Sequence, residues 1–132
     1  MCTMKEVCER VGMSYETLRF YCNEGLVPNV ARDKNNYRSF DERNIRWLES
    51  LQCLKRCGMS IQDMKVYMNL CLAGKSSIPE RKRMLDILRA YLLSKLDEIN
   101  ASIEFIDTKQ AFYDGVLAGE LPYTSNLIAI DE

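Results

Sequence analysis

Residues 14–28, which read SYETLRFYCNEGLVP, decide the fold of this chain of 132 residues. Ser14 offers a side-chain oxygen that can cap a helix beginning at Tyr15 and running to about Glu24. Leu18 and Cys22 fall on one face of that helix. The opposite face carries a guanidinium, an aromatic ring and small polar groups, contributed by Glu16, Arg19, Phe20 and Asn23. Such a face suits contact with the groove and phosphates of a nucleic acid.

A shorter helix precedes this segment. Its apolar residues recur at positions i, i+3, i+4 and i+7, namely Met4, Val7, Cys8 and Val11. Thr3 can cap its start, and Gly12 can adopt the left-handed conformation that ends a helix. Two helices joined by a tight glycine-containing turn predict a helix-turn-helix.

The segment after the second helix predicts a small wing. Residues 26–28 are short and extended and would form its first strand, whereas residues 37–40 alternate as a second strand would. The polar residues 32–36 would join the two strands. Asn36 tolerates the positive φ that can turn such a loop.

Two further helices complete the predicted head. Asp41 can cap a helix that carries apolar residues up to Leu54 and stops at Gly58. Residues 60–63 resemble a capping box at the start of a fourth helix. Residues 1–73 therefore predict a mainly α, winged helix-turn-helix DNA-binding domain with a two-stranded wing.

A long helix is predicted for the rest of the chain. Residues 74–78 are small and polar and predict a hinge, residues 79–117 predict the helix, and residues 118–132 form a tail. The apolar residues of the helix are spaced by threes and fours: Leu85, Leu88, Leu92, Leu96, Ile99, Ile103, Ile106, Tyr113 and Leu117. At 1.5 Å per residue the helix would extend about 58 Å. A stripe of that length needs a partner, so we expect a coiled coil with a second copy, in a strand direction that the spacing leaves open.

Charge is unevenly distributed along the chain. Residues 1–73 carry 11 Lys and Arg against 9 Asp and Glu, whereas residues 74–132 carry 7 against 10. The basic excess therefore belongs to the predicted head, but it is small. DNA binding is expected to depend on a few well-placed arginines and not on a broad basic surface.

The composition argues against several classes of protein. The chain has no run of about 18 apolar residues and no apolar signal core, so we expect a cytoplasmic protein without a membrane partner. Its six cysteines are then expected to be reduced thiols. With no histidine, no glycine-rich phosphate loop and no recognisable carboxylate pair, the chain is not expected to be an enzyme, and no cofactor is predicted.

The motifs of the head resemble those of the MerR family of transcription regulators. Residues 17–21 (TLRFY) followed by residues 24–28 (EGLVP) are similar to its recognition-helix signature. Residues 36–40 (NYRSF) resemble its wing signature, and residues 54–61 (LKRCGMSI) resemble the second half of its head. Phe20 stands where tyrosine is usual. The resemblance extends to the long helix, and it implies that two copies pair there as an antiparallel coiled coil.

By that resemblance, the homodimer would bind a promoter whose spacer between the two polymerase elements is too long. It would activate transcription by bending and untwisting the DNA, so that RNA polymerase is an indirect partner. The resemblance implies DNA contacts from Tyr15, Thr17, Arg19, Phe20, Tyr21, Tyr37, Arg38 and Arg56. Thr17 and Arg19 would reach base edges or phosphate, Tyr21 and the wing residues would hold the DNA backbone, and Arg56 would touch phosphate. Tyr21 and Phe40 have the alternative interpretation of core residues.

The cysteines are the residues with the most distinctive chemistry. Structural burial is expected for three thiols that lie on or beside apolar stripes, Cys8, Cys22 and Cys71. Cys53 and Cys57 fall off the apolar stripe of the third helix, where a thiol can be reached. Residues 45–53 and 107–114 resemble the aldehyde- and thiol-stress (NmlR/AdhR-like) branch, in which the cysteine matching Cys53 is the proposed sensor. Our hypothesis is that a reactive electrophile alkylates or oxidises Cys53 and shifts the dimer between DNA-bound states.

Other functions stay open at this point. Cys53 and Cys57, four residues apart, could share a soft cation such as copper(I) or zinc in a metal-ion-responsive regulator. The metal sensors of the family resemble one another in cysteines at the start of the long helix and beyond it, whereas this chain has none after Cys71. An architectural winged-helix protein without an effector would share the head alone, and a protein-interaction adaptor would use only the coiled coil.

Overall fold

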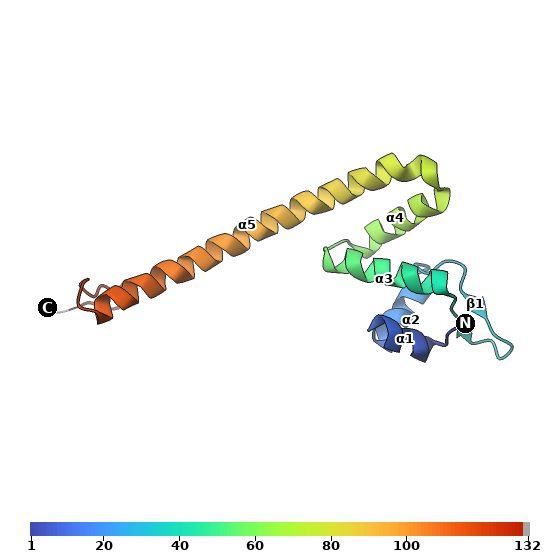
Figure 1. Ribbon diagram of the computed structural model, residues 1–132, viewed down its shortest axis with the longest axis horizontal. Helices are drawn as coiled ribbons and strands as arrows, with labels where there is room; N and C mark the ends of the chain where they lie inside the picture. Colours follow the sequence, from blue (N-terminus) through green and yellow to red (C-terminus); the bar gives the residue numbers. More distant parts are fainter. Residues whose placement is uncertain (131–132) are drawn as a thin grey trace. The chain divides into compact units, whose positions relative to one another are not determined.

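The computed structural model describes residues 1–130. In chain order its elements are α1 (Met4–Val11), α2 (Tyr15–Asn23), β1 (Ala31–Arg32), β2 (Arg38–Ser39), α3 (Glu42–Arg56), α4 (Ile61–Ala73), the short 3-10 helix η1 (Lys75–Ser77) and α5 (Ile78–Leu117) (Figure 1). The chain divides into a first compact unit, Met1–Arg89, and a second unit that begins at Ala90. The predicted mainly helical fold, with a helix-turn-helix head, a two-stranded wing and a long C-terminal helix, is confirmed.

The helix-turn-helix follows from local capping. Thr3 and Glu6 form a capping box at the start of α1, in which each side chain accepts a hydrogen bond from the other residue's backbone N–H. Gly12 ends α1 with φ 74°, a left-handed conformation that a residue with a Cβ adopts only under strain. Ser14 Oγ then accepts from the Thr17 N–H at 3.1 Å and starts α2. These are the caps that the sequence predicted.

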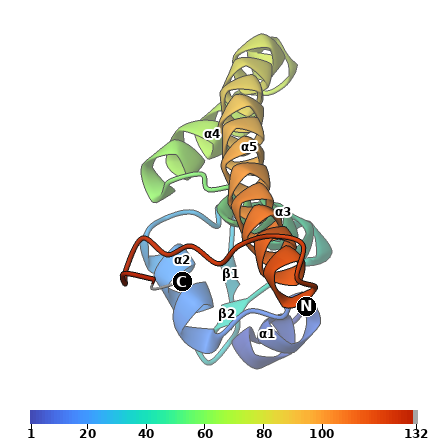
Figure 2. The same cartoon turned by 90° about the vertical axis from the view of Figure 1, so that its left-hand side faces the viewer.

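The wing lies beside α1 and α2 in both Figure 1 and Figure 2. Its strands are antiparallel, and Ala31 is paired with Ser39. The prediction that residues 26–28 form the first strand is wrong. Leu26 and Val27 are instead buried, because the chain turns at the end of α2 and directs both side chains into the core. The loop turns as predicted at Asn36, which has φ 64°.

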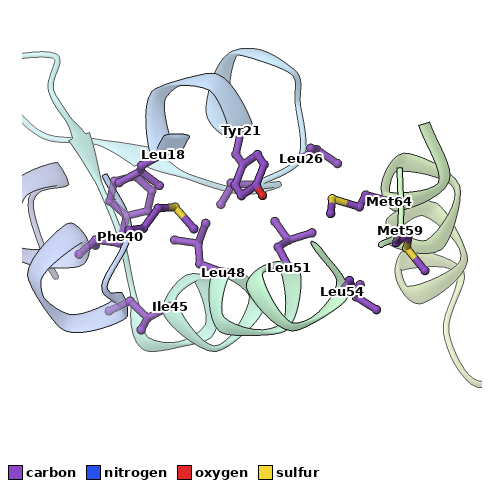
Figure 3. Close-up of a cluster of buried hydrophobic side chains, with 13 residues drawn as sticks. Leu18, Tyr21, Leu26, Phe40, Ile45, Leu48, Leu51, Leu54, Met59 and Met64 are labelled. Atoms are coloured by element: carbon purple, nitrogen blue, oxygen red, sulfur yellow. The ribbon is translucent and has the colours of Figure 1, made fainter. Parts of the chain in front are cut away.

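One apolar core holds the first unit together. In Figure 3 the side chains of Leu18 and Tyr21 from α2 face Leu48 and Leu51 from α3. Phe40, at the end of the wing, is completely buried in the same cluster. Its burial confirms the alternative interpretation of this ring as a core residue.

The connection from α4 to α5 is more ordered than a hinge. Of the predicted hinge at 74–78, residues Lys75–Ser77 form η1, and Ile78 already belongs to α5. Met84 and Leu88 on α5 pack against the core of the head. For this reason the first compact unit continues to Arg89, although the predicted division of the chain lies at 73/74.

The second unit contains the remainder of α5 and the tail. None of the residues of α5 is buried, and its predicted apolar stripe is exposed throughout this unit. The tail reverses at Gly119, where φ is 76°, and the Leu121 side chain passes over Gly115. A Cβ at Gly115 would lie 2.5 Å from Leu121 Cδ1, so glycine permits this close approach. Within residues 1–130, no helix is both long and apolar enough to cross a membrane.

Candidate nucleic-acid interface

The outward face of α2 is polar, aromatic and accessible. Tyr15 is 56% exposed and Phe20 is 46% exposed, and Arg19 lies between them in sequence with an exposed side chain. Thr17 is half-buried, and its Oγ1 accepts a hydrogen bond from the Ser14 hydroxyl at 2.9 Å. The structure therefore leaves Arg19 and the two rings free to meet a ligand, while the Thr17 hydroxyl is partly engaged in the cap.

Tyr21 does not belong to this accessible face. Its side chain is 1% exposed, and its hydroxyl has no hydrogen-bond partner within residues 1–130. Burial raises the pKa of the phenol. The burial of the ring on the Leu18 face of α2 agrees with the alternative interpretation of Tyr21 as a core residue, and its contact with the DNA backbone stays a prediction. The spacing of three residues from Leu18 already placed the ring on that face.

The wing carries two predicted residues, and one of them contacts α2. Tyr37 is 70% exposed on the wing. Arg38 is half-buried, and its Nη2 donates to Asn23 Oδ1 at 2.8 Å, which ties β2 to the end of α2. Asn23 was predicted to face outward, but its role as the partner of Arg38 depends on a long-range contact that the sequence does not reveal.

A hollow of about 440 Å³ lies where the start of α2 meets the end of α3, and we call it the cation hollow. Lys55 and Arg56, both exposed, line it together with Ser14 and Thr17 from the first turn of α2. Tyr21 also lines it. Two cations beside a helix N-terminus favour an anion, because the helix dipole and the free backbone N–H groups add to their charge. Lys55 was not predicted as a site residue, although it directly precedes the predicted Arg56.

A second hollow, of about 670 Å³, contains the cysteine that was singled out from the sequence. We call it the thiol hollow, and its lining includes Arg46, Trp47, Glu49, Cys53, Tyr67 and Cys71. Cys53 is exposed, whereas Cys71 is half-buried. The rings of Trp47 and Tyr67 are stacked, with centroids 6.5 Å apart and planes 6° apart. The hollow thus offers an accessible thiol beside an aromatic wall and a guanidinium.

The remaining cysteines differ from Cys53. Cys57 is half-buried just after α3 and, unlike Cys53, does not line the thiol hollow. Cys8 and Cys22 pack against the core, and burial raises the pKa of both thiols. A protonated, half-buried thiol is a poor nucleophile. Among residues 1–130, no group of three or more His, Cys, Asp or Glu side chains could hold a metal ion.

These features define a winged helix-turn-helix protein in which the outward face of α2 is exposed, and comparison with known sequences agrees. The model of the MerR HTH family of regulatory proteins matches residues 2–71. An uncharacterised HTH-type transcriptional regulator of Haemophilus influenzae is 36% identical over 111 residues, which cover 84% of this chain and 82% of that one. AdhR, an HTH-type transcriptional regulator of Bacillus subtilis, is 36% identical over 80 residues, or 61% of this chain and 57% of its own length.

Solved structures extend the similarity to the long helix. HiNmlR, a MerR family regulator lacking the sensor domain and bound to promoter DNA, has a TM-score of 0.76 and 34% identity, covering 92% of this chain and 96% of that one. A proposed MerR family regulator of Listeria monocytogenes has a TM-score of 0.80 and 28% identity, with 90% of each chain covered. This chain belongs to the MerR family of helix-turn-helix transcription regulators.

Proposed function

We propose that this regulator binds double-stranded promoter DNA through residues 1–73 and acts as a homodimer. The observation that carries the proposal is that Arg19 and Phe20 of α2 and Tyr37 of the wing are all exposed, while the Arg38–Asn23 hydrogen bond ties the wing to the end of α2. The structure of HiNmlR bound to promoter DNA supports the same kind of partner for this chain. Cations are few among these residues, so the affinity for DNA depends on their placement.

Each residue of the face has a distinct proposed role. Arg19 would reach base edges in the major groove or the adjacent phosphates, with Thr17 beside it. Tyr15 and Phe20 flank this contact, and Phe20 lacks the hydroxyl with which a tyrosine could bind phosphate. Arg38 can hold the wing against α2 and still offer N–H groups to the DNA backbone, because a guanidinium has five donors.

The cation hollow provides a second anchor. Arg56 would contact a phosphate, and Lys55 would contribute to the same site. The first turn of α2 would add its backbone N–H groups to that contact. Phosphate contacts of this kind fix the register of the head on the duplex, whereas Arg19 supplies the sequence preference.

Dimerisation is proposed for α5. Residues 78–95 carry five Lys and Arg against two Asp and Glu, whereas residues 96–117 carry one Lys against five Asp and Glu. An antiparallel pair places each basic half against an acidic half and opposes the two helix dipoles, but a parallel pair places like charges together. Charge therefore favours the antiparallel coiled coil, with the apolar stripe of each helix as the seam.

A dimer with two heads can deform the promoter between its half-sites. Bending or untwisting a site of this length costs a few kcal/mol, on the order of 1–6, which contacts from both heads can offset. RNA polymerase would respond to the altered spacer without touching the regulator. This function places the protein in the cytoplasm, where the promoter is found and thiols are kept reduced.

The proposed effector is a reactive aldehyde or related electrophile that modifies Cys53. The Cys53 sulfur would attack the carbonyl carbon, forming a C–S bond while the π electrons of C=O move to oxygen. That oxygen takes a proton, and the thiol proton is released to water, so the product is a hemithioacetal with no change in oxidation state. The exposure of Cys53 and the room beside it in the thiol hollow support this step.

The DNA-binding proposal is tested by footprinting on the DNA upstream of the gene, followed by gel retardation of the protected fragment. Arg19→Ala is expected to weaken binding about 5- to 150-fold, as loss of a base contact of about 1–3 kcal/mol would. Arg83→Ala removes the same charge from α5 and serves as the matched control. Equal affinity of the Arg19→Ala variant and the wild type would refute the role of α2.

The effector proposal is tested with the same fragment after treatment with formaldehyde. Cys53→Ser is expected to abolish the aldehyde-dependent change in the footprint and leave basal binding intact. Cys57→Ser, the matched control four residues away, should respond as the wild type does. A Cys53→Ser protein that still responds would eliminate Cys53 as the sensor, without affecting the DNA-binding proposal.

A further inference from the structure

The elbow between α4 and α5, residues 70–81, contains buried polar contacts that DNA binding does not use. Ser77 is 7% exposed, although its side chain is polar. Its hydroxyl lies within hydrogen-bond distance of the backbone carbonyl oxygens of Leu70 and Gly74. The single hydroxyl proton can be donated to only one of these carbonyl oxygens at a time. The Ser77 Oγ can in addition accept a hydrogen bond from another donor.

Arg81, in the first turns of α5, supplies that donor. Its Nε donates to Ser77 Oγ at 3.0 Å, and its Nη2 donates to the Gly74 carbonyl oxygen at 2.8 Å. Gly74 has φ 89° and ψ −160°, a conformation that favours glycine and gives its carbonyl this direction. Because a guanidinium is planar, its two bonds hold Ser77 and Gly74 in one fixed orientation relative to α5.

A third contact connects the elbow to the thiol hollow. Arg81 Nη1 lies 3.9 Å from the Cys71 sulfur, and Cys71 lines the hollow together with Tyr67. A molecule that occupies the hollow is thus separated from Arg81 by one side chain. All of these residues belong to the first compact unit.

We propose that Arg81 is the positioning residue that fixes the angle between α4 and the start of α5, and thereby the separation at which a dimer presents its two heads to DNA. The inference rests on the proposed function, because the separation of the heads matters only when both bind one duplex. A fixed elbow makes the dimer selective for one spacing of half-sites. Loss of the guanidinium leaves each head folded but allows the angle to vary.

The first test measures the elbow itself, without DNA. Hydrogen exchange is followed by mass spectrometry in Arg81→Met, in Arg81→Lys and in the exposed control Arg83→Met. Exchange in the peptide that contains Ser77 and Ile78 is expected to rise about tenfold in both Arg81 variants and to stay unchanged in the control. Methionine has no N–H donor, and lysine has a single nitrogen in place of the two planar nitrogens that bond Ser77 and Gly74. Unchanged exchange in Arg81→Met would refute the proposal that Arg81 holds the elbow in a fixed conformation.

The second test measures spacing selectivity. The probe is the duplex that the wild-type protein enriches from a random-sequence library, compared with the same duplex carrying one base pair inserted at its centre. The insertion rotates one half-site by about 34–36° relative to the other, so the wild type and Arg83→Met are expected to bind it about tenfold more weakly. In the two Arg81 variants the difference should fall below about threefold.

The outcomes separate this inference from the proposed function. Faster exchange in Arg81→Met with an unchanged tenfold discrimination would overturn the role of Arg81 in spacing but leave DNA binding intact. Failure of the wild type to enrich any duplex would overturn the proposed function, and the spacing role with it. Far-UV circular dichroism and sedimentation confirm that each variant is folded and that its oligomeric state matches the wild type.

Discussion

The two compact units of this chain differ in how far their apolar side chains are buried. The first unit buries Leu18, Leu48 and Leu51 completely, together with the ring of Phe40. In the second, the stripe of α5 stays open, and Ile103 is half exposed. The head is therefore stabilised by its own core, whereas the long helix leaves exposed the stripe that the proposed second copy would cover.

The largest effect is expected from opening the core of the first unit. Leu48→Ala should lower the free energy of unfolding by about 2–5 kcal/mol, because it removes a completely buried side chain and leaves a cavity. Urea denaturation monitored by the fluorescence of Trp47, the single tryptophan, reports on this unit. Leu96→Ala changes the second unit, which contains no tryptophan, so it should shift the transition reported by Trp47 far less at the same protein concentration. Equal shifts would remove the contrast between the two units.

An intermediate effect is expected from a charge in the seam. Ile99→Asp should convert the dimer to a monomer, because an antiparallel pair buries this residue and an unpaired carboxylate there is costly. Affinity for the full operator should fall by at least about 100-fold, since the two heads no longer act together. Sedimentation and gel retardation measure the two consequences, and Ala101→Asp, an exposed position on the side of the helix opposite the stripe, is the control. A dimer that survives Ile99→Asp would place the interface elsewhere.

The smallest effect is expected at the surface of the head. Arg10 forms a two-bond ion pair with Glu42, with distances of 2.6 and 3.0 Å, and this hydrogen bonding lowers the pKa of Glu42 below its ordinary value of 4.5. The pair therefore stabilises the fold above that value, and the stabilisation is lost as the pH falls through the lowered pKa. Glu42→Gln should slightly lower the Tm near neutral pH and flatten its decline in acid. Glu9→Gln is the control, and identical pH profiles for Glu42→Gln and the wild type would contradict the assignment.

Local patterns predicted most of the helical structure. Thr3, Ser14 and Asp41 all cap helices where the sequence placed them, because capping depends on side chains and backbone groups only three residues apart. The seam of the long helix was equally readable from its spacing. The helical period of 3.6 residues also predicted that the side chains of Arg19 and Cys53 are exposed.

Predictions failed where neighbours in space outweighed neighbours in sequence. Leu26 has the side chain and setting of a strand residue, yet it packs into the core because the turn after α2 brings it toward Trp47, whose Nε1 donates to the Leu26 carbonyl oxygen at 2.7 Å. For Tyr21 the resemblance implied a DNA contact with core packing as the alternative, and the ring is 1% exposed. In both cases the gain from excluding an apolar group from water decided the outcome.

The sequence by itself determined the helices, their caps and the exposed seam, because a period of 3.6 residues and a cap three residues away are properties of a short stretch of chain. Only the tertiary structure decided that Cys53 and Cys71 line one hollow, that Arg38 meets Asn23, and that Arg81 closes the elbow. The two cysteines are 18 positions apart on different helices, and Arg38 and Asn23 are 15 apart. Which polar groups meet over such separations is set by how the apolar faces pack, and a linear pattern does not contain that packing.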